Sequence, residues 1–364
     1  MARKNENSRH SKFILRIVCE GDKTEPLFFS DLCNAYYADD EYVDFRTIPQ
    51  PYTPEENNAE DQTTRGWHKS KKRKVRDSAA DAANAPVICG QPPLKWVLYA
   101  RQLLSEGVDE AWAVYDKDEH PMHKEAFEEA SKVVDGKFVN IAFSSRSFEY
   151  YLLLHFEYLY YAFAQTECGE RIDGKKLIYE CGTGKFPDKE CNGKNCINGY
   201  ARTRGYWTET KSDESTFPLV KDRLLIGLIN ACRLREQSNS ETDAPIYERN
   251  PYTDVDKLVG RLIGKSVIPF GNAYGDCLSS VNRTITLTEN GIEIENLGER
   301  TDLFARGSIS ALNLVNGNRR ILNETTFITA PHEKSVLECT IKNAEIVCVR
   351  VSSGKEIILL PNGN

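Results

Sequence analysis

The chain has 364 residues, 40% hydrophobic and 28% charged, and this composition excludes a protein that is disordered throughout. Such a length exceeds one ordinary core and predicts two domains, or three. The net charge of -7 argues against a protein that coats polyanions without specificity. It is compatible with a nuclease, because carboxylates hold metal while a local basic patch contacts phosphate.

The sequence favours a cytoplasmic protein with no membrane association. The mean hydropathy is -0.51, and no stretch offers the roughly 18 consecutive apolar residues of a membrane-spanning helix. The first ten residues lack the apolar region of a signal peptide. Eleven cysteines without a secretory signal indicate thiols or a metal site rather than disulfides.

Strand and helix patterns alternate through the first part of the chain. In chain order they predict a strand at residues 13–19, a helix at 26–37, a polar insertion at about 43–93, a helix at 94–104, a strand at 110–115, a helix at 124–134 and a strand at 137–143. This alternation is typical of an α/β domain with a mainly parallel sheet. Its sites lie beyond the carboxyl ends of the strands.

The pattern then changes from helices to strands. It predicts an aromatic-rich helix at 148–164, a cysteine-rich insertion at about 166–215, helices at 217–237 and 253–263, and strands at 284–288, 291–295, 335–341, 345–351 and 356–360. Turn signals at 289–291 and 315–318 separate some of these strands. We therefore expect an α/β domain over residues 1–270, with helical insertions, and a small all-β domain over 271–364.

Acidic residues follow two of the predicted strands directly. Glu20 comes after the first strand, and Asp116 and Asp118 come after a later one. If these strands are neighbours, the three carboxylates converge into a hard oxygen site for Mg²⁺ or Mn²⁺, which suits phosphodiester chemistry. Lys23 would offset the charge of a phosphate. The alternative is a solvated loop after one strand and a simple turn with a helix start after the other.

Four blocks of sequence resemble the RloB family, in the same order and over residues 14–262. They are Glu20-Gly21-x-Lys23-Thr24-Glu25-Pro26-x-Phe28-Phe29, Tyr115-Asp116-Lys117-Asp118-Glu119, Ala142-Phe143-Ser144-x-x-Ser147-Phe148-Glu149-x-x-Leu152-Leu153-Leu154-His155-Phe156, and Asn250-Pro251-x-Thr253-Asp254-Val255 with Leu258-Val259. The chain departs from the family in having Ser145-Arg146-Ser147 where Asn-Pro is usual. Arg146 is a candidate phosphate contact.

The resemblance implies a Toprim-like Rossmannoid fold in which a catalytic glutamate matches Glu20 and an acidic pair matches Asp116 and Asp118, binding Mg²⁺. It also implies a role in bacterial antiphage defence. Such proteins often act with an ATPase partner, and related Toprim effectors cleave DNA or RNA.

Four further residues of these blocks have both a functional and a structural interpretation. Glu149 is a candidate fourth carboxylate, or a favourable charge in a first helical turn. His155 is better explained as a packed core histidine than as a base. Thr253 or Asp254 suits a helix N-cap, with a role at the active-site rim as the alternative.

A basic segment stands out in this acidic chain. It consists of Arg65, Trp67, Lys69, Lys71, Lys72, Arg73, Lys74 and Arg76. Positive charge around one aromatic suits phosphate contact with base stacking, whereas a solvated loop is the usual explanation of a charge run. The Toprim resemblance favours the first interpretation, and we therefore expect nucleic-acid contact here.

Four cysteines lie in one hydrophilic stretch, at Cys168, Cys181, Cys191 and Cys196. Four soft ligands could hold a structural Zn²⁺, but the irregular spacing lacks Cys-x₂-Cys, so ordinary reduced cysteines are the alternative.

These features together favour a metal-dependent nuclease. A sensor or scaffold that binds nucleic acid, a phage protein or an ATPase partner without cutting is the second hypothesis, and phosphoryl transfer other than hydrolysis ranks last.

Overall fold

The computed structural model of the chain describes residues 12–49, 92–117, 120–167, 171–172, 175–176, 195–207, 214–272, 274–276, 281–351 and 353–361. The chain divides into two compact units. The first unit comprises Met1–Leu224 and Thr242–Val255, and the second comprises Leu225–Glu241 and Asp256–Asn364. No helix in the described ranges has both the length and the apolar character needed to cross a bilayer.

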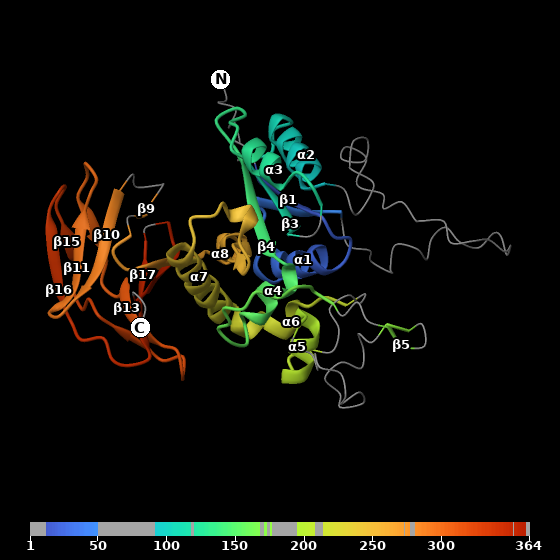
Figure 1. Cartoon of the computed structure of the whole chain (residues 1–364). Coiled ribbons are helices and arrows are strands. Elements are labelled where there is room, and N and C mark those ends of the chain that lie inside the picture. Colours follow the sequence, from blue (N-terminus) through green and yellow to red (C-terminus); the bar gives the residue numbers. More distant parts are fainter. Residues whose placement is uncertain are drawn as a thin grey trace, which may run out of the picture. The chain divides into compact units, whose positions relative to one another are not determined.

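A five-stranded sheet forms the centre of the first unit (Figure 1). Its strands, in spatial order, are β2 (Val43–Ile48), β1 (Phe13–Cys19), β3 (Glu110–Asp116), β4 (Val139–Ser145) and β7 (Tyr252–Thr253). The first four are parallel to one another, and only β7 is antiparallel, to β4. The predicted α/β class with a mainly parallel sheet is confirmed, and β1 has the predicted bounds.

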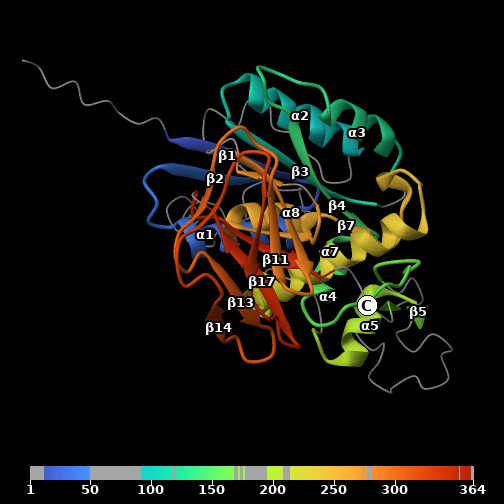
Figure 2. The same cartoon turned by 90° about the vertical axis from the view of Figure 1, so that its left-hand side faces the viewer.

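Helices cover both faces of this sheet. Figures 1 and 2 show α2 (Pro93–Ser105) and α3 (His123–Ala130) on one face and α1 (Thr24–Tyr37) on the other. Beneath α2, β3 contributes Ala111 and Ala113, both 0% exposed, which let Trp96 and Val97 of the helix pack against the strands. The aromatic side chains of Phe28 and Phe29 in α1 make edge-on contacts with Phe148.

Two predicted helices end earlier than expected. Helix α3 stops at Ala130 rather than near residue 134, and Asp135 and Gly136, both with positive φ, form a turn that pairs Val134 with Lys137. Helix α4 (Phe148–Leu153) replaces the long helix predicted at residues 148–164. The chain then turns at 154–156 and continues without helix.

The continuation beyond α4 packs through hydrogen bonds that a helix would not make. Tyr150 Oη donates to the carbonyl of Leu159 at 2.7 Å, and the Phe163 side chain is 0% exposed. The aromatic and apolar residues at 148–164 therefore reflect burial of this segment rather than one continuous helix. The predicted helix at 217–237 is also divided, into α6 (Phe217–Val220), a 3₁₀ turn (Lys221–Arg223) and α7 (Leu224–Glu241).

The remaining elements of the first unit are short. They are β5 (Arg171–Ile172), which pairs with β6 (Lys175–Lys176), helix α5 (Ile197–Arg204) and a 3₁₀ turn (Ile246–Glu248).

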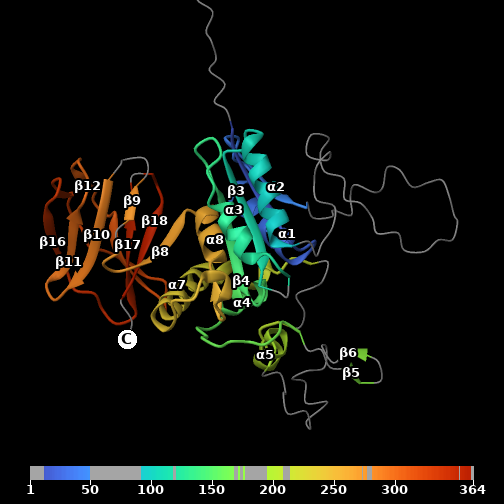
Figure 3. The same cartoon turned by 45° about the horizontal axis from the view of Figure 1, so that its top comes forward.

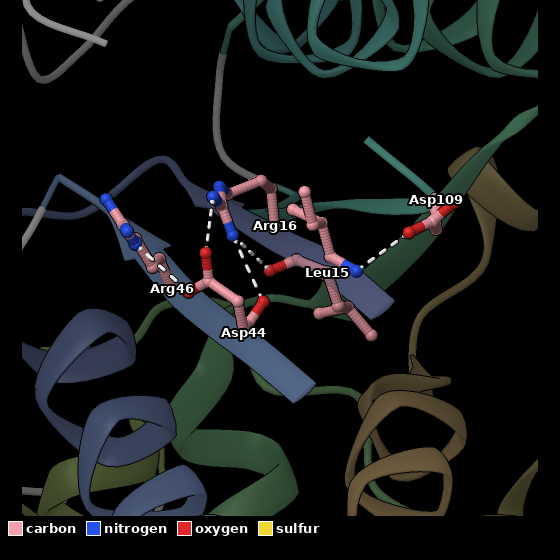
Figure 4. Close-up of polar contacts among 6 residues, drawn as sticks. Leu15, Arg16, Asp44, Arg46 and Asp109 are labelled. Atoms are coloured by element: carbon pink, nitrogen blue, oxygen red, sulfur yellow. Dashed lines mark hydrogen bonds and ion pairs between the residues drawn. The ribbon is translucent and has the colours of Figure 1, made fainter. Parts of the chain in front are cut away.

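Strand β2 lies inside the segment predicted as an insertion, so that prediction is wrong for residues 43–48, while 50–91 fall outside the described residues. Its polar residues are matched to β1 (Figure 4). Arg16 is buried and its guanidinium donates to Asp44 Oδ2 at 3.1 Å, and Arg46 donates to Asp44 Oδ1 at 3.1 Å. The charged residues that interrupt the apolar pattern of β2 are therefore paired, Asp44 with Arg16 of β1 and Arg46 with Asp44 in the same strand.

The second unit is rich in strands, as predicted for the C-terminal region. After α8 (Val255–Ile263) come β8 (Lys265–Pro269), β9 (Tyr274–Asp276), β10 (Val281–Thr288), β11 (Gly291–Asn296), β12 (Asp302–Phe304), β13 (Ile309–Asn313), β14 (Arg319–Ile321), β15 (Phe327–Thr329), β16 (Lys334–Glu338), β17 (Glu345–Arg350) and β18 (Glu356–Leu360). They form sheets ordered β16-β11-β10-β9 and β14-β13-β17-β18-β8 and the pair β12-β15.

The two larger sheets of this unit pack face to face (Figure 3). Ile285, Ile292 and Ile294 of one sheet share a buried cluster with Val347 and Leu359 of the other. The predicted turn after β10 is confirmed, because Glu289 and Asn290 form a two-residue hairpin loop. The domain boundary at residue 270 stays a prediction.

Gly291 closes this hairpin in a conformation that other residues rarely adopt. Its φ is 140°, and a Cβ would lie 2.2 Å from the carbonyl oxygen of Leu337. The Asn-Gly signal in the sequence thus has a steric cause.

We predict that Asp44→Asn lowers the free energy of unfolding at pH 7 by about 1–3 kcal/mol, because it leaves buried Arg16 without its anion. Burial raises the pKa of Asp44, but the Arg16 and Arg46 guanidiniums outweigh it and hold that pKa below the ordinary value. The stabilisation is therefore present above the ordinary carboxyl pKa of about 4 and is lost as the pH falls through the lower folded value.

Urea unfolding at pH 7 and at pH 3 measures both effects, with exposed Glu41→Gln as the control. A loss for Asp44→Asn that is equal at the two pH values would contradict the role of the carboxylate charge.

Candidate functional site

The carboxylate of Glu20 lies against the end of β3. Strands β1 and β3 are parallel neighbours with Cys19 in register with Val114, and Glu20 N donates to the Val114 carbonyl at 2.9 Å. The next contact involves the side chain, since Asp116 N donates to Glu20 Oε2 at 3.2 Å. Both residues are half-buried. The ends of β1 and β3 therefore bring the carboxylate of Glu20 into contact with the backbone of Asp116.

The third predicted carboxylate, Asp118, lies outside the described residues. Within the described ranges no three or more His, Cys, Asp or Glu side chains form a group that could hold a metal ion. Glu20 and Asp116 nevertheless have the oxygen donors that Mg²⁺ and Mn²⁺ prefer. The donor chemistry fits such an ion, and completion of the set depends on Asp118.

A further carboxylate, Glu25, folds back over the turn that follows β1. A Cβ on Gly21 would lie 2.2 Å from Glu25 Oε2, so a larger residue at this position would displace the carboxylate. Glu25 is buried in the first turn of α1. Burial raises the pKa of the Cys19 thiol, and the Glu25 charge raises it further. Glu25 was not among the predicted site residues, and Gly21, four residues earlier, was the available signal.

Positive charge also gathers at this edge of the sheet. Lys23 is exposed and occupies the N-cap position of α1. Lys117 directly follows Asp116, and its ammonium donates to the carbonyl of Glu248 and, at 3.5 Å, to that of Arg249. Burial lowers the pKa of Lys117, and the positive charge of Arg146 lowers it further. Lys117 was not among the predicted site residues.

Glu149 lies in the first turn of α4, four residues beyond the end of β4, and is 3% exposed. It does not join Glu20 and Asp116 in a group of three potential metal ligands among the described residues. Its interpretation as a fourth carboxylate stays a prediction.

Thr253 and Asp254 attach the block that precedes α8 to the end of β4. Asp254 N donates to the Phe143 carbonyl at 3.0 Å, and Phe143 N donates to Asp254 Oδ1 at 2.7 Å. The hydroxyls of Ser144 and Thr253 lie 2.7 Å apart. Val255 N, at the start of α8, donates to Thr253 Oγ1 at 3.4 Å. The residues thus begin a helix, as predicted, and also extend the sheet.

Tyr115 is buried within reach of the charges of Asp254 and Glu20. Burial raises its pKa, and the negative charges of Asp254 and Glu20 add to that effect. Its buried hydroxyl has no hydrogen-bond partner among the described residues.

His155 is a packed core residue, as the sequence favoured. It is 0% exposed, its Nδ1 lies 3.1 Å from the Tyr151 carbonyl, and its ring contacts the Tyr151 ring edge-on. Burial lowers the pKa of His155 from 6.5 to about 4. The side chain is neutral at pH 7 and shielded from solvent, so it does not act as a base for a bound substrate.

Two predicted sites fall largely outside the described residues. The basic segment, from Arg65 to Arg76, does so entirely, as do Cys168, Cys181 and Cys191. Cys196 is described and buried at the N-cap position of α5. Nucleic-acid contact by the segment and zinc binding by the cysteines stay predictions.

Comparison with known proteins agrees with the blocks noted in the sequence. A family model described as RloB-like protein matches residues 15–262. No curated protein and no solved structure matches the chain.

We predict that lowering the pH from 7 to 5 destabilises the protein by about 2 kcal/mol through His155 alone. The folded pKa of about 4 lies below the ordinary 6.5, so the unfolded chain binds the proton first and stability falls as the pH drops between these values. Urea unfolding of wild type and His155→Met at both pH values measures this difference, with exposed His332→Gln as the control. An equal pH dependence in wild type and His155→Met would contradict it.

Proposed function

The chain belongs to the RloB-like protein family, and we propose that it is a metal-dependent nuclease of bacterial antiphage defence that hydrolyses phosphodiester bonds in DNA or RNA. The observation that carries this proposal is the contact between Asp116 N and Glu20 Oε2, 3.2 Å apart at the ends of neighbouring parallel strands. This contact juxtaposes acidic residues from distant parts of the sequence, as a catalytic site requires and a pair of solvated loops does not.

The order of the strands supports a Toprim-like fold. Strands β2, β1, β3 and β4 are parallel, with an acidic residue directly after β1 and an acidic residue at the end of β3. In open α/β sheets, ligands bind outside the carboxyl ends of the strands. Glu20 and Asp116 lie at that edge.

A divalent cation, Mg²⁺ or Mn²⁺, would be held by Glu20, Asp116 and Asp118. When bound, such an ion neutralises phosphate charge and lowers the pKa of a coordinated water. The fixed hydrogen bond from Asp116 N orients Glu20 before any ligand arrives, which reduces the cost of ordering that side chain.

The surrounding residues supply substrate affinity in this proposal. Lys23 and the basic segment that includes Arg65 and Trp67 would contact phosphates and bases of the nucleic acid. Buried Glu25 adds negative charge beside the turn at Gly21 and would help to retain the cation. Zinc binding by the four cysteines and association with an ATPase partner are further proposals that the family resemblance or the residue types suggest.

One observation favours a second function, a sensor or scaffold that binds nucleic acid, a phage protein or an ATPase partner without cutting. Among the described residues no group of three potential metal ligands is assembled. If Asp118 does not complete the set, Glu20 is a structural acceptor for the end of β3.

We predict that the wild-type chain cleaves members of a panel of RNA and DNA with Mg²⁺ or Mn²⁺, and that Asp116→Asn and Glu20→Gln each lower the rate about 100-fold or more, because each removes a charge that retains the cation. Gel analysis of end-labelled substrates measures the rate, and circular dichroism confirms folding.

Asp109→Asn is the matched control. Asp109 lies just before β3, at the opposite end of that strand from Asp116, and its Oδ2 accepts a hydrogen bond from Ile14 N at 2.8 Å. Its substitution should leave the rate within about threefold of wild type. Cleavage by Asp116→Asn at the wild-type rate would contradict the proposal.

A further inference from the structure

Three consecutive residues beyond and at the end of β4 carry buried polar atoms that lack a hydrogen-bond partner among the described residues. They are Ser145 Oγ, Arg146 Nε and Ser147 Oγ. Ser145 is 0% exposed and Ser147 is 4% exposed. Buried polar groups in folded proteins nearly always have a partner. The described residues supply no partner for these three atoms in succession, an arrangement that suits a bound ligand.

Ser147 makes this point most clearly. It occupies the N-cap position of α4, where a serine hydroxyl normally accepts a hydrogen bond from a backbone amide of the first turn. Its hydroxyl makes no such bond, although its carbonyl accepts from Tyr150 N at 2.9 Å. A serine hydroxyl reorients by rotation about one bond and can donate or accept. The Ser147 hydroxyl is therefore available for a hydrogen bond to a ligand, because it does not cap the helix.

Two cationic residues, Lys117 and Arg146, follow the ends of the neighbouring strands β3 and β4. Asp116 is in register with Ser144, and Lys117 N donates to the Ser144 carbonyl at 2.8 Å, so Lys117 and Arg146 leave adjacent strands at the same edge. Both side chains are half-buried. No carboxylate pairs with Arg146 in the described part of the chain. Two neighbouring cations repel in a partly desolvated place unless an anion joins them.

We propose that Arg146 and Lys117, with the hydroxyls of Ser145 and Ser147, bind a backbone phosphate of a nucleic-acid strand next to Glu20 and Asp116. This inference rests on the proposed function, because it places the substrate's backbone at this edge of the sheet. A guanidinium binds phosphate oxygens through two parallel hydrogen bonds, and serine hydroxyls donate to them. Phosphate carries no base identity, so this contact positions the strand without selecting sequence.

The test is direct binding of labelled single-stranded DNA and RNA to the full chain, measured by fluorescence anisotropy in EDTA at several salt concentrations. We predict that Arg146→Gln raises Kd about five- to tenfold, by the same factor for different base sequences, and reduces the slope of log Kd against log salt by about one. Ser147→Ala raises Kd about two- to threefold with an unchanged Tm, because its hydroxyl has no partner in the protein.

The matched control is Arg306→Gln, since Arg306 is an exposed arginine of the second unit paired with Glu324 at 3.5 Å. Its Kd and salt slope should remain at the wild-type values. Arg146→Lys keeps the charge and should retain the salt slope while losing part of the affinity. Wild-type affinity and salt slope in Arg146→Gln would overturn the inference.

Chemical modification covers the case in which Arg146→Gln does not fold. Phenylglyoxal labelling of the wild-type chain, read by mass spectrometry, should be slower at Arg146 when an oligonucleotide is bound, and equal labelling overturns the inference. ATP and inorganic phosphate serve as competitors. If Arg146 is required for ATP binding and not for oligonucleotide binding, the phosphate is that of a nucleotide, which also overturns it.

Binding in EDTA separates this inference from the proposed function. Arg146-dependent binding without any metal-dependent cleavage would remove the nuclease and leave the phosphate site. If Arg146→Gln cleaves and binds nucleic acid as wild type does, the phosphate site is excluded and the proposed nuclease activity stands.

Discussion

The parallel pairing of β3 with β1 on one side and β4 on the other is the constraint on which the candidate site depends. With Cys19 in register with Val114, β3 continues two residues past the end of β1, and Asp116 N donates to Glu20 Oε2 at 3.2 Å. The register of Asp116 with Ser144 carries the same edge across to β4, where Arg146 follows. A shift of either register by one residue would separate these groups and turn each side chain to the opposite face.

Packing and buried polar contacts hold that register. Small residues in β3, Ala111 and Ala113, let α2 lie close to the strands. On the side of the sheet where β2 lies, Asp44 neutralises Arg16 and so permits a charged residue within β1. On the side where β7 lies, Asp254 forms hydrogen bonds with both the amide and the carbonyl of Phe143.

Regular patterns in the sequence predicted the parts of the fold that depend on one-sided burial. Strand β1 and the hairpin at Asn290-Gly291 follow directly from an apolar run and a turn dipeptide. Strand β2 was not predictable, because Asp44 and Arg46 interrupt its apolar residues, and the buried partner of Asp44, Arg16, lies on the neighbouring strand. The length of α4 was not predictable either, since a buried aromatic run reads alike in helical and extended chain.

Within the candidate site, Glu20 and Asp116 could be predicted because they follow strands, whereas Glu25 depended on the space above Gly21 and Lys117 on its contacts with a distant loop. The most direct test of the central claim is a titration of the full chain with Mn²⁺, followed by electron paramagnetic resonance. The account predicts a bound ion whose affinity falls at least about tenfold in both Glu20→Gln and Asp116→Asn and is unchanged in Asp109→Asn. Equal Mn²⁺ affinity in wild type and in those two variants, or no binding at all, would contradict it.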